Sequence, residues 1–169
     1  VTSYDVQRPQ PSELAVTLRD YQEEALNKMI ERVQGYICLP CGAGKTVIGS
    51  SAIICANQPT LVLVHTEDLC KQWEEAFSGL HYLQPRVVGS GQNPMFKWKP
   101  LGPFNHATSM VQTLHANPSK RKALLESAGA VLLDECHHAP ASSFRSLFAD
   151  IPARYRWGLT ATPDRADGW

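Results

Sequence analysis

Short runs of apolar residues, each of strand length and each followed by polar or glycine-containing sequence, recur along this chain. Residues 61–64 and 130–133 are apolar at every position, so both faces of such a strand must be covered by other parts of the protein. Segments with apolar residues at helical spacing, such as 18–33 and 67–77, separate these runs. Strands that alternate with helices in this way indicate an α/β fold, a mostly parallel sheet with helices on both faces.

The same patterns place the individual elements. Strands are predicted at 36–39, 60–65, 86–88, 130–133 and 154–159, and helices at 18–33, 45–56, 67–77, 109–114, 118–127 and 142–149. A capping-type Ser12 precedes the first helix, and residues 90–103 are rich in glycine and proline, which predicts a loop. Because parallel sheets bind ligands at the carboxyl ends of their strands, we look for function at that edge.

Composition limits the classes of protein that this chain can represent. A length of 169 residues fits one domain, and 16 basic residues balance 16 acidic ones, so net charge gives no argument for a nucleic-acid partner. The apolar runs are too short to span a bilayer, and residues 1–11 lack the apolar segment of a signal peptide. Five cysteines without an export signal favour free thiols in a reducing compartment. We therefore expect a cytoplasmic location, associated with the nucleoid in a bacterium or phage-infected cell.

Residues 42–46, Gly-Ala-Gly-Lys-Thr, follow a predicted strand and open a predicted helix, the context that a phosphate-binding loop requires. Glycines let backbone N–H groups approach phosphate oxygens, and the helix N-terminus adds a favourable dipole. Lys45 would reach the β- and γ-phosphates, and the Thr46 hydroxyl would hold Mg²⁺. The usual pattern G-x-x-x-x-G-K-[ST] has a glycine where this chain has Leu39.

Two further polar motifs follow predicted strands. Asp134 and Glu135 come 89 residues after Lys45 (134 − 45) and leave a purely apolar strand, where a buried carboxylate is costly unless it binds a cation. Asp134 suits Mg²⁺, and Glu135 suits orienting and deprotonating a water molecule. Thr160 and Thr162 end the last strand, where two hydroxyls could hydrogen-bond His137 and report the state of the γ-phosphate.

A zinc site is the main competing interpretation. Cys38 and Cys41 have C-x-x-C spacing, and Cys136, His137 and His138 end a strand at the same edge, so together they could supply tetrahedral ligands. Zinc, however, does not explain the glycines, lysine and threonine that follow. Other nucleotide enzymes fit less well, because the N-K-x-D motif of a GTPase and an arginine-bearing lid of a kinase are missing from the sequence.

Taken in order, these motifs resemble those of the first RecA-like domain of superfamily 2 DExH DNA helicases and translocases. That group includes XPB-type repair helicases, phage helicases and restriction-enzyme motor subunits. Residues 40–46 resemble motif I, 63–66 with Gln72-Trp73 motif Ia, 134–137 motif II and 160–162 motif III. Residues 18–22 resemble the adenine-reading Q-type motif. In this family an apolar residue followed by proline often replaces the first glycine of motif I, so Leu39 is expected.

The resemblance implies a role for each matching residue. It implies adenine contacts from Arg19 and Gln22, and phosphate contacts from Pro40, Cys41, Gly42, Ala43, Gly44, Lys45 and Thr46. Lys45, Asp134 and Glu135 become the candidate catalytic residues, Thr46 and Asp134 the Mg²⁺ ligands, and His137, Thr160 and Thr162 the coupling residues. Nucleic-acid contacts are implied for His65, Thr66, Gly89 and Gln112. Met110 stands where a threonine is common, and Thr108 or Ser109 could substitute for it.

The function implied is that of the ATP-binding domain of a DNA-dependent ATPase that moves on DNA, with ATP and Mg²⁺ as cofactors. A restriction-enzyme motor subunit and a non-enzymatic zinc module remain the alternatives. DNA is the expected partner rather than RNA, and no membrane association is expected. The family's second RecA-like domain, which supplies arginine fingers, is not found in residues 1–169. Because such fingers contribute roughly 10³–10⁵ in rate, we expect this chain alone to bind nucleotide and hydrolyse it slowly.

Overall fold

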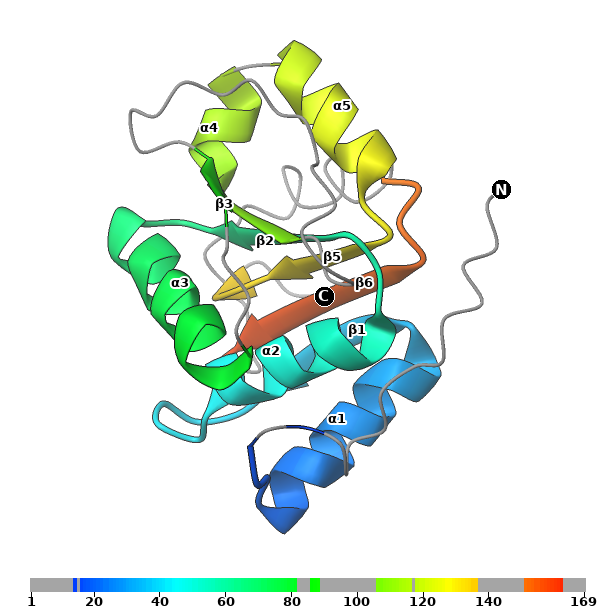
Figure 1. Cartoon of the computed structure of the whole chain (residues 1–169), viewed down its shortest axis with the longest axis vertical. Coiled ribbons are helices and arrows are strands. Elements are labelled where there is room, and N and C mark those ends of the chain that lie inside the picture. The colour runs from blue at the N-terminus through cyan, green and yellow to red at the C-terminus, as the bar shows by residue number, and fades with distance from the viewer. Residues whose placement is uncertain are drawn as a thin grey trace.

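The computed structural model describes residues 14, 16–81, 86–88, 106–116, 118–136 and 151–162 (Figure 1). In these residues, six strands form one sheet in the order β1-β6-β5-β2-β4-β3, and every neighbouring pair is parallel. The strands are β1 (Gln34–Cys38), β2 (Thr60–Val64), β3 (Arg86–Val88), β4 (His106–Met110), β5 (Ala130–Leu133) and β6 (Tyr155–Thr160). The helices are α1 (Asp20–Arg32), α2 (Lys45–Ala56), α3 (Glu67–His81), α4 (Val111–Ala116) and α5 (Pro118–Ser127).

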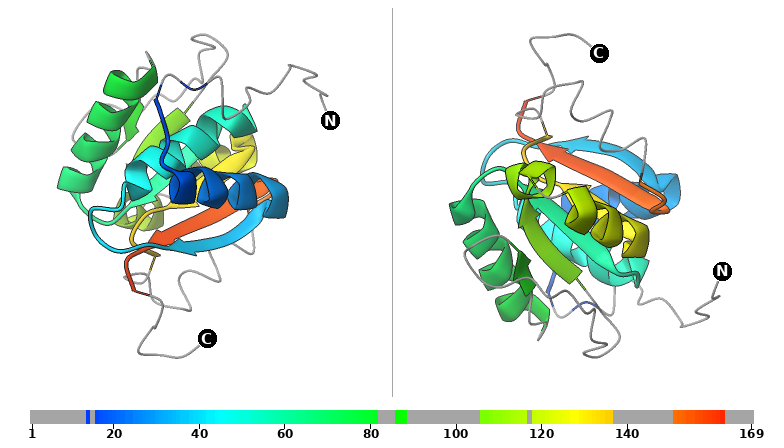
Figure 2. Two further views of the ribbon diagram at one scale, coloured as in Figure 1. Left: turned by 90° about the horizontal axis from the view of Figure 1, so that it is seen from below. Right: turned by 90° about the horizontal axis from the view of Figure 1, so that it is seen from above.

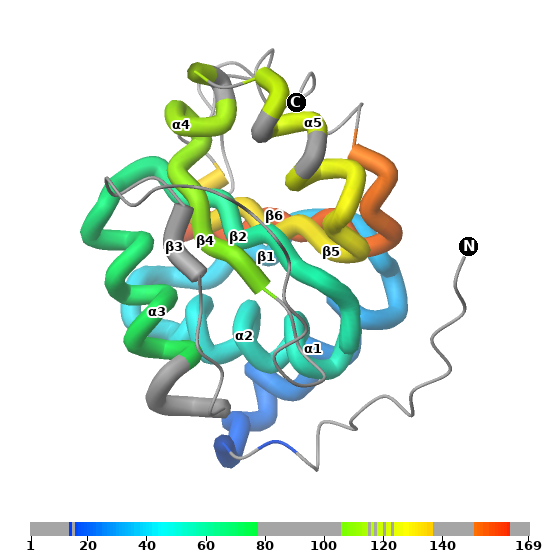
Figure 3. Tube along the Cα trace, turned by 45° about the horizontal axis from the view of Figure 1, so that its top comes forward, coloured from blue at the N-terminus to red at the C-terminus, as the bar shows by residue number. Residues whose placement is uncertain are grey.

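Helices cover both faces of the sheet. Figure 2 shows α1 and α2 in front of the sheet from one side and α4 and α5 in front of it from the other, and in Figure 3 α3 lies beside α2. Alternate strand residues enter the two cores: Val62 and Leu132 pack with α1, α2 and α3, whereas Leu61 and Val131 pack with α4 and α5. The alternation follows from the two-residue period of a strand and confirms the predicted α/β class.

Strand β4 was not predicted. The sequence pattern places Ser109 and Met110 in a helix, but they belong to β4, and α4 begins only at Val111. The prediction was wrong because His106, Thr108 and Ser109 are polar, yet β4 is buried between β2 and β3, where neighbouring strands satisfy its backbone. The helix predicted at 142–149 and the loop predicted at 90–103 lie outside the described residues.

Smaller differences occur at helix ends. Helix α1 begins at Asp20 and is capped by Arg19, whose backbone N–H donates to the Gln22 side chain at 2.9 Å, so Ser12 is not its cap. Helix α3 extends beyond the predicted end at residue 77 to His81. Helices α2 and α5 have the predicted bounds.

The parallel sheet brings distant segments to one edge. The strands β1, β2, β5 and β6 all end there and are followed by the residues that the motifs single out. Backbone hydrogen bonds continue past the strand ends: the Leu39 N–H donates to the Thr160 carbonyl at 3.0 Å, and the Asp134 N–H donates to the Leu63 carbonyl at 2.9 Å. These bonds fix the starting points of the loops that form the site.

Candidate nucleotide site

The loop from Leu39 to Gly44 joins β1 to α2 and has the backbone of a phosphate-binding loop. Gly42 and Gly44 have φ values of 80° and 79°, a region that residues with a Cβ rarely adopt. Gly44 is the N-cap of α2, so Lys45 and Thr46 are the first two helical residues and their N–H groups have no partner within the helix. Free N–H groups at a helix N-terminus are suited to bind phosphate.

The Lys45 ammonium lies beside Glu135. Its Nζ is 3.8 Å from Glu135 Oε1 and donates to the Leu39 carbonyl at 3.3 Å. The Lys45 side chain is 10% exposed and the Glu135 side chain is 23% exposed, so both are largely shielded from solvent. Glu135 has a φ of 50°, a left-handed conformation that is uncommon for a residue with a side chain and that often occurs at functional sites.

Asp134 is buried, with 4% of its surface exposed. Burial raises the pKa of its carboxyl above the usual value, and hydrogen bonds from Trp73 Nε1 to Oδ2 (2.8 Å) and from the Glu135 N–H to Oδ1 (2.9 Å) offset only part of this rise. A carboxylate in this position fits Mg²⁺, which takes one or two protein ligands and completes its shell with water and phosphate oxygens. Among the described residues, no group of three or more His, Cys, Asp or Glu side chains could hold a metal by itself.

The predicted adenine contacts lie next to the loop. The Gln22 side chain donates from Nε2 to the Ala43 carbonyl at 3.1 Å, and the Tyr21 hydroxyl donates to the same oxygen at 2.9 Å. A Cβ on Gly44 would be 2.5 Å from Gln22 Nε2, so the glycine also leaves room for this side chain. Gln22 therefore connects the start of α1 to the loop, and Arg19 is exposed beside it. Tyr21 had no role in the sequence-based prediction.

Thr160 and Thr162 lie at the end of β6. The Thr160 hydroxyl donates to the Thr162 carbonyl at 3.0 Å and accepts from the Thr162 N–H at 3.2 Å, which closes a tight turn. The Thr160 carbonyl accepts a hydrogen bond from the Leu39 N–H, so Thr160 lies next to the glycine loop. The predicted coupling partner His137 lies outside the described residues.

The predicted nucleic-acid contacts lie at the ends of β2 and β4. Thr66 caps α3, because its hydroxyl accepts from the Leu69 N–H at 3.3 Å, and Gln112 donates from Nε2 to the His65 carbonyl at 3.2 Å. His65, Thr66 and Gln112 are thus close together, and Gln112 is exposed. Gly89 lies outside the described residues.

Thr108 and Ser109 do not substitute for the threonine that is missing at position 110. Both are fully buried within β4, so neither can contact a phosphate at the surface. The expectation was wrong because both residues belong to β4, a strand that lies between β2 and β3.

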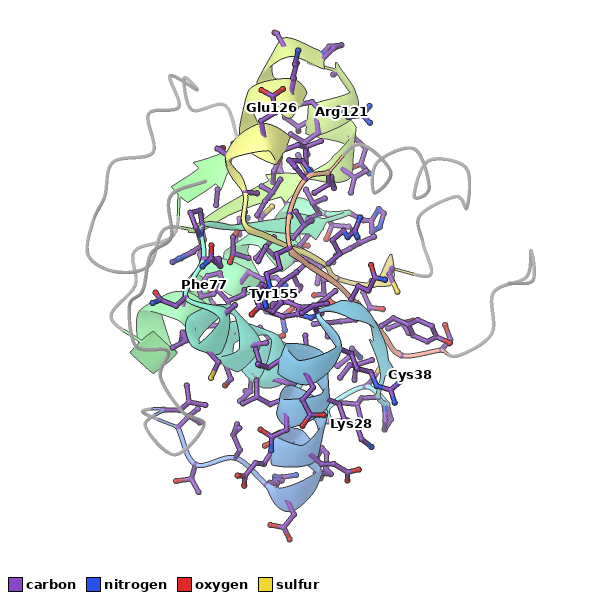
Figure 4. The ribbon with its side chains drawn as sticks, turned by 90° about the vertical axis from the view of Figure 1, so that its right-hand side faces the viewer. Lys28, Cys38, Phe77, Arg121, Glu126 and Tyr155 are labelled. Atoms are coloured by element: carbon purple, nitrogen blue, oxygen red, sulfur yellow. The ribbon has the colours of Figure 1, made fainter. Side chains whose placement is uncertain are left out.

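The cysteines are spread over the strand ends. Cys38 and Cys41 are exposed, whereas Cys136 is buried. Figure 4 shows Cys38 at the outer side of the sheet, away from the interior where Phe77 and Tyr155 lie. His137 and His138, the other candidate zinc ligands, lie outside the described residues.

Trp73 contacts the site, although the sequence analysis assigned it only to motif Ia. It is fully buried on α3, seven positions after Thr66, and therefore on the same face of the helix as that cap. A signal was available, because a tryptophan at this spacing from a strand end must bury its ring against the sheet and find an acceptor for its N–H.

Comparisons with known proteins agree with this architecture. A family model described as "Type III restriction enzyme, res subunit" matches residues 15–165. The "DNA 3'-5' translocase XPB2" of Sulfurisphaera tokodaii is 31% identical over 90% of this chain and 32% of its own length. The "DNA 3'-5' helicase XPB" of Kineococcus radiotolerans is 36% identical over 89% of this chain and 27% of its own length. The chain thus spans about a third or less of these relatives.

A solved structure shows the same fold. The UvsW helicase from Bacteriophage T4 superposes with a TM-score of 0.73 at 22% identity, over 89% of this chain and 54% of that one. Among the described residues, no helix is both long and apolar enough to cross a bilayer. Since the family model covers residues 15–165, nearly the whole chain, the protein belongs to the family described as the res subunit of type III restriction enzymes.

Proposed function

We propose that this chain is the ATP-binding domain of a motor that couples ATP hydrolysis to movement on DNA. The observation that carries the proposal is the meeting of three groups at one sheet edge: the glycine loop, Lys45 at the start of α2, and the carboxylates of Asp134 and Glu135 after β5. A phosphate loop beside a lysine and two carboxylates is the set of groups that nucleoside triphosphate hydrolysis requires.

Each group has a distinct chemical task. The loop N–H groups and Lys45 would bind the phosphates, and Thr46 and Asp134 would hold Mg²⁺, which would supply positive charge to neutralise the phosphates. Glu135 lies near Lys45 and orients and deprotonates the water that attacks the γ-phosphorus. Thr160 and Thr162, with His137, would pass the state of the γ-phosphate to the rest of the motor.

DNA is the proposed track. Relatives are named as a DNA translocase and a DNA helicase, and His65, Thr66 and Gln112 lie together at the ends of β2 and β4 on the edge that carries the nucleotide site. The second RecA-like domain would close on this edge and supply the arginine fingers. For residues 1–169 tested alone, we expect slow turnover and no directed movement.

The first test is calorimetric titration with Mg-ADP and Mg-ATP. The unchanged chain should bind both, and Lys45→Ala should abolish or strongly weaken binding. Lys28→Ala is the matched control, because Lys28 also pairs with a glutamate, Glu24 at 2.6 Å, but is exposed on the outside of α1 (Figure 4). Equal binding by the Lys45 variant and the parent would contradict the proposal, as would a lack of binding together with one bound zinc per chain.

DNA binding needs a separate test. Fluorescence anisotropy with a labelled single strand and a labelled duplex should show salt-dependent binding that Gln112→Ala weakens. Glu126→Ala on α5 should leave it unchanged, because the Glu126 side chain is exposed and pairs with Lys122 on the same helix rather than with the proposed DNA contacts. Binding of RNA in preference to both DNA probes would overturn the choice of DNA.

A further inference from the structure

The carboxylate of Asp134 is held by two donors from different parts of the chain. The Trp73 indole N–H donates to Oδ2 at 2.8 Å, and the Glu135 backbone N–H donates to Oδ1 at 2.9 Å. An ionised carboxylate offers about four lone-pair directions, so two remain after these bonds. With one donor on each oxygen, the plane of the carboxylate is fixed.

The indole ring is itself firmly held. Trp73 is fully buried. A Cβ on Gly49 of α2 would lie only 2.7 Å from Cη2 of the indole, so the glycine makes room for the ring. Its ring centroid lies 5.5 Å from that of Phe77, one turn further along α3. The ring therefore cannot turn without displacing α2 or α3.

We propose that Trp73 is a positioning residue for the metal site: its indole N–H fixes the carboxylate of Asp134 so that the remaining lone pairs point in one direction toward Mg²⁺. The inference rests on the proposed function, which makes Asp134 a Mg²⁺ ligand. Groups that hydrogen-bond a metal ligand orient it, and their loss commonly costs 10–100-fold in metal affinity.

A second buried tryptophan separates this role from simple packing. Trp157 is 2% exposed, and its indole N–H donates to the Met29 carbonyl at 3.0 Å. It thus makes a bond of similar length to a backbone carbonyl rather than to a metal ligand. A purely structural role for Trp73 predicts similar consequences for Trp73→Phe and Trp157→Phe, because each loses one N–H donor and a similar volume.

The test measures the Mg²⁺ dependence of ADP binding in the parent, Trp73→Phe and Trp157→Phe. We expect Trp73→Phe to raise the half-saturating Mg²⁺ concentration about tenfold, with ADP affinity in EDTA unchanged. Trp157→Phe should retain the parent value. Equal Mg²⁺ dependence in all three, or an equal shift in both variants, would overturn the proposal. A parent that binds no Mg-ADP contradicts the proposed function itself, which distinguishes the two failures.

A measurement on the unsubstituted protein covers the case in which Trp73→Phe does not fold. The chain has four tryptophans, so the ¹⁵N-indole spectrum is simple, and Trp98→Phe, Trp157→Phe and Trp169→Phe identify the Trp73 resonance by elimination. Adding Mg²⁺ to the ADP-bound protein should shift the Trp73 indole resonance and leave that of Trp157 in place. A Trp73 resonance that does not respond to Mg²⁺ would overturn the proposal.

Discussion

The Lys45 ammonium lies 3.8 Å from the Glu135 carboxylate, although the two residues come from different strands' ends and are far apart in sequence. Lys45 begins α2 after β1, and Glu135 follows β5; β6 lies between these two strands in the sheet. The short distance therefore shows that the loop after β1 and the acidic motif after β5 lie next to each other. It also places a cation beside the Glu135 carboxylate.

Glu135→Gln should separate binding from hydrolysis. The amide keeps the size of the side chain but cannot accept a proton, so we expect hydrolysis to fall about 10²–10⁴-fold while the Kd for Mg-ATP changes little. Single-turnover hydrolysis with the chain in excess over labelled ATP measures this even when turnover is slow. Glu126→Gln is the control, because Glu126 also lies 3.8 Å from a lysine, Lys122, but on α5. Unchanged hydrolysis in Glu135→Gln would remove Glu135 from its proposed role.

Gln22→Ala should weaken both the start of α1 and the recognition of adenine. The side chain accepts from the Arg19 N–H and donates to the Ala43 carbonyl, so its removal frees a cap and a loop contact. We expect a loss of about 1 kcal/mol in the free energy of unfolding. The ratio of the Kd for GDP to that for ADP should also fall. Glu23→Ala, on the same helix but exposed, should leave the preference for ADP unchanged. A preserved preference for ADP would show that Gln22 acts only as a cap.

The meeting of these motif residues at one sheet edge was predictable because they follow strands whose apolar sequence leaves little choice. β5 is apolar at every position, so the acidic pair after it had to lie at a strand end, and a glycine loop between a strand and a helix has few other uses. The parallel sheet then brings Gly44, Lys45 and Asp134 to one edge without further information.

The contacts between elements were not predictable in the same way. β4 is polar in sequence and buried in fact, so its pattern gives the wrong secondary structure for Ser109 and Met110. The bond from Trp73 to Asp134 depends on how closely α3 approaches the sheet, and this distance is set by packing against Gly49, far away in sequence. Periodicity assigns a residue to a face but does not specify which partner it meets there.

Gly49→Ala should destabilise the protein although alanine is the better helix former. Alanine gains about 1 kcal/mol in helix propensity, but a Cβ would lie 2.7 Å from the Trp73 ring and 3.1 Å from Leu132 and Leu159 methyl groups. Overpacking of a filled core costs about 1–3 kcal/mol. We therefore expect a net loss of up to about 2 kcal/mol in the free energy of unfolding, measured by denaturant unfolding.

Ser51→Ala, two positions along the same helix, is the matched control. Its buried hydroxyl has no hydrogen-bond partner among the described residues, so replacing it with a methyl-sized side chain removes an unsatisfied group. We expect the free energy of unfolding to stay the same or rise. Stabilisation by Gly49→Ala as large as that by Ser51→Ala would show that Trp73 does not fill the space beside α2.

His106 should make the fold sensitive to mild acid. The ring is 6% exposed, its centroid lies 4.1 Å from that of Phe77, and neither ring nitrogen has a hydrogen-bond partner in the part of the chain that the structure describes. Burial lowers the pKa of His106 from 6.5 to about 4. The folded state thus keeps the ring neutral in a range of pH where the unfolded chain protonates it.

The sign of the effect follows from this difference. Because folding depresses the pKa of His106, the free energy of unfolding is unaffected by this group above pH 6.5. It decreases as the pH falls toward 4, since the unfolded chain binds a proton at His106 that the folded chain does not. The full effect is about 3 kcal/mol, and chemical denaturation at a series of pH values measures it. His106→Leu keeps an apolar side chain against Phe77 and cannot be protonated, so its stability should decline less steeply between pH 6.5 and 4. Parallel curves for the parent and His106→Leu over this range would mean that His106 is not the buried group that responds to acid.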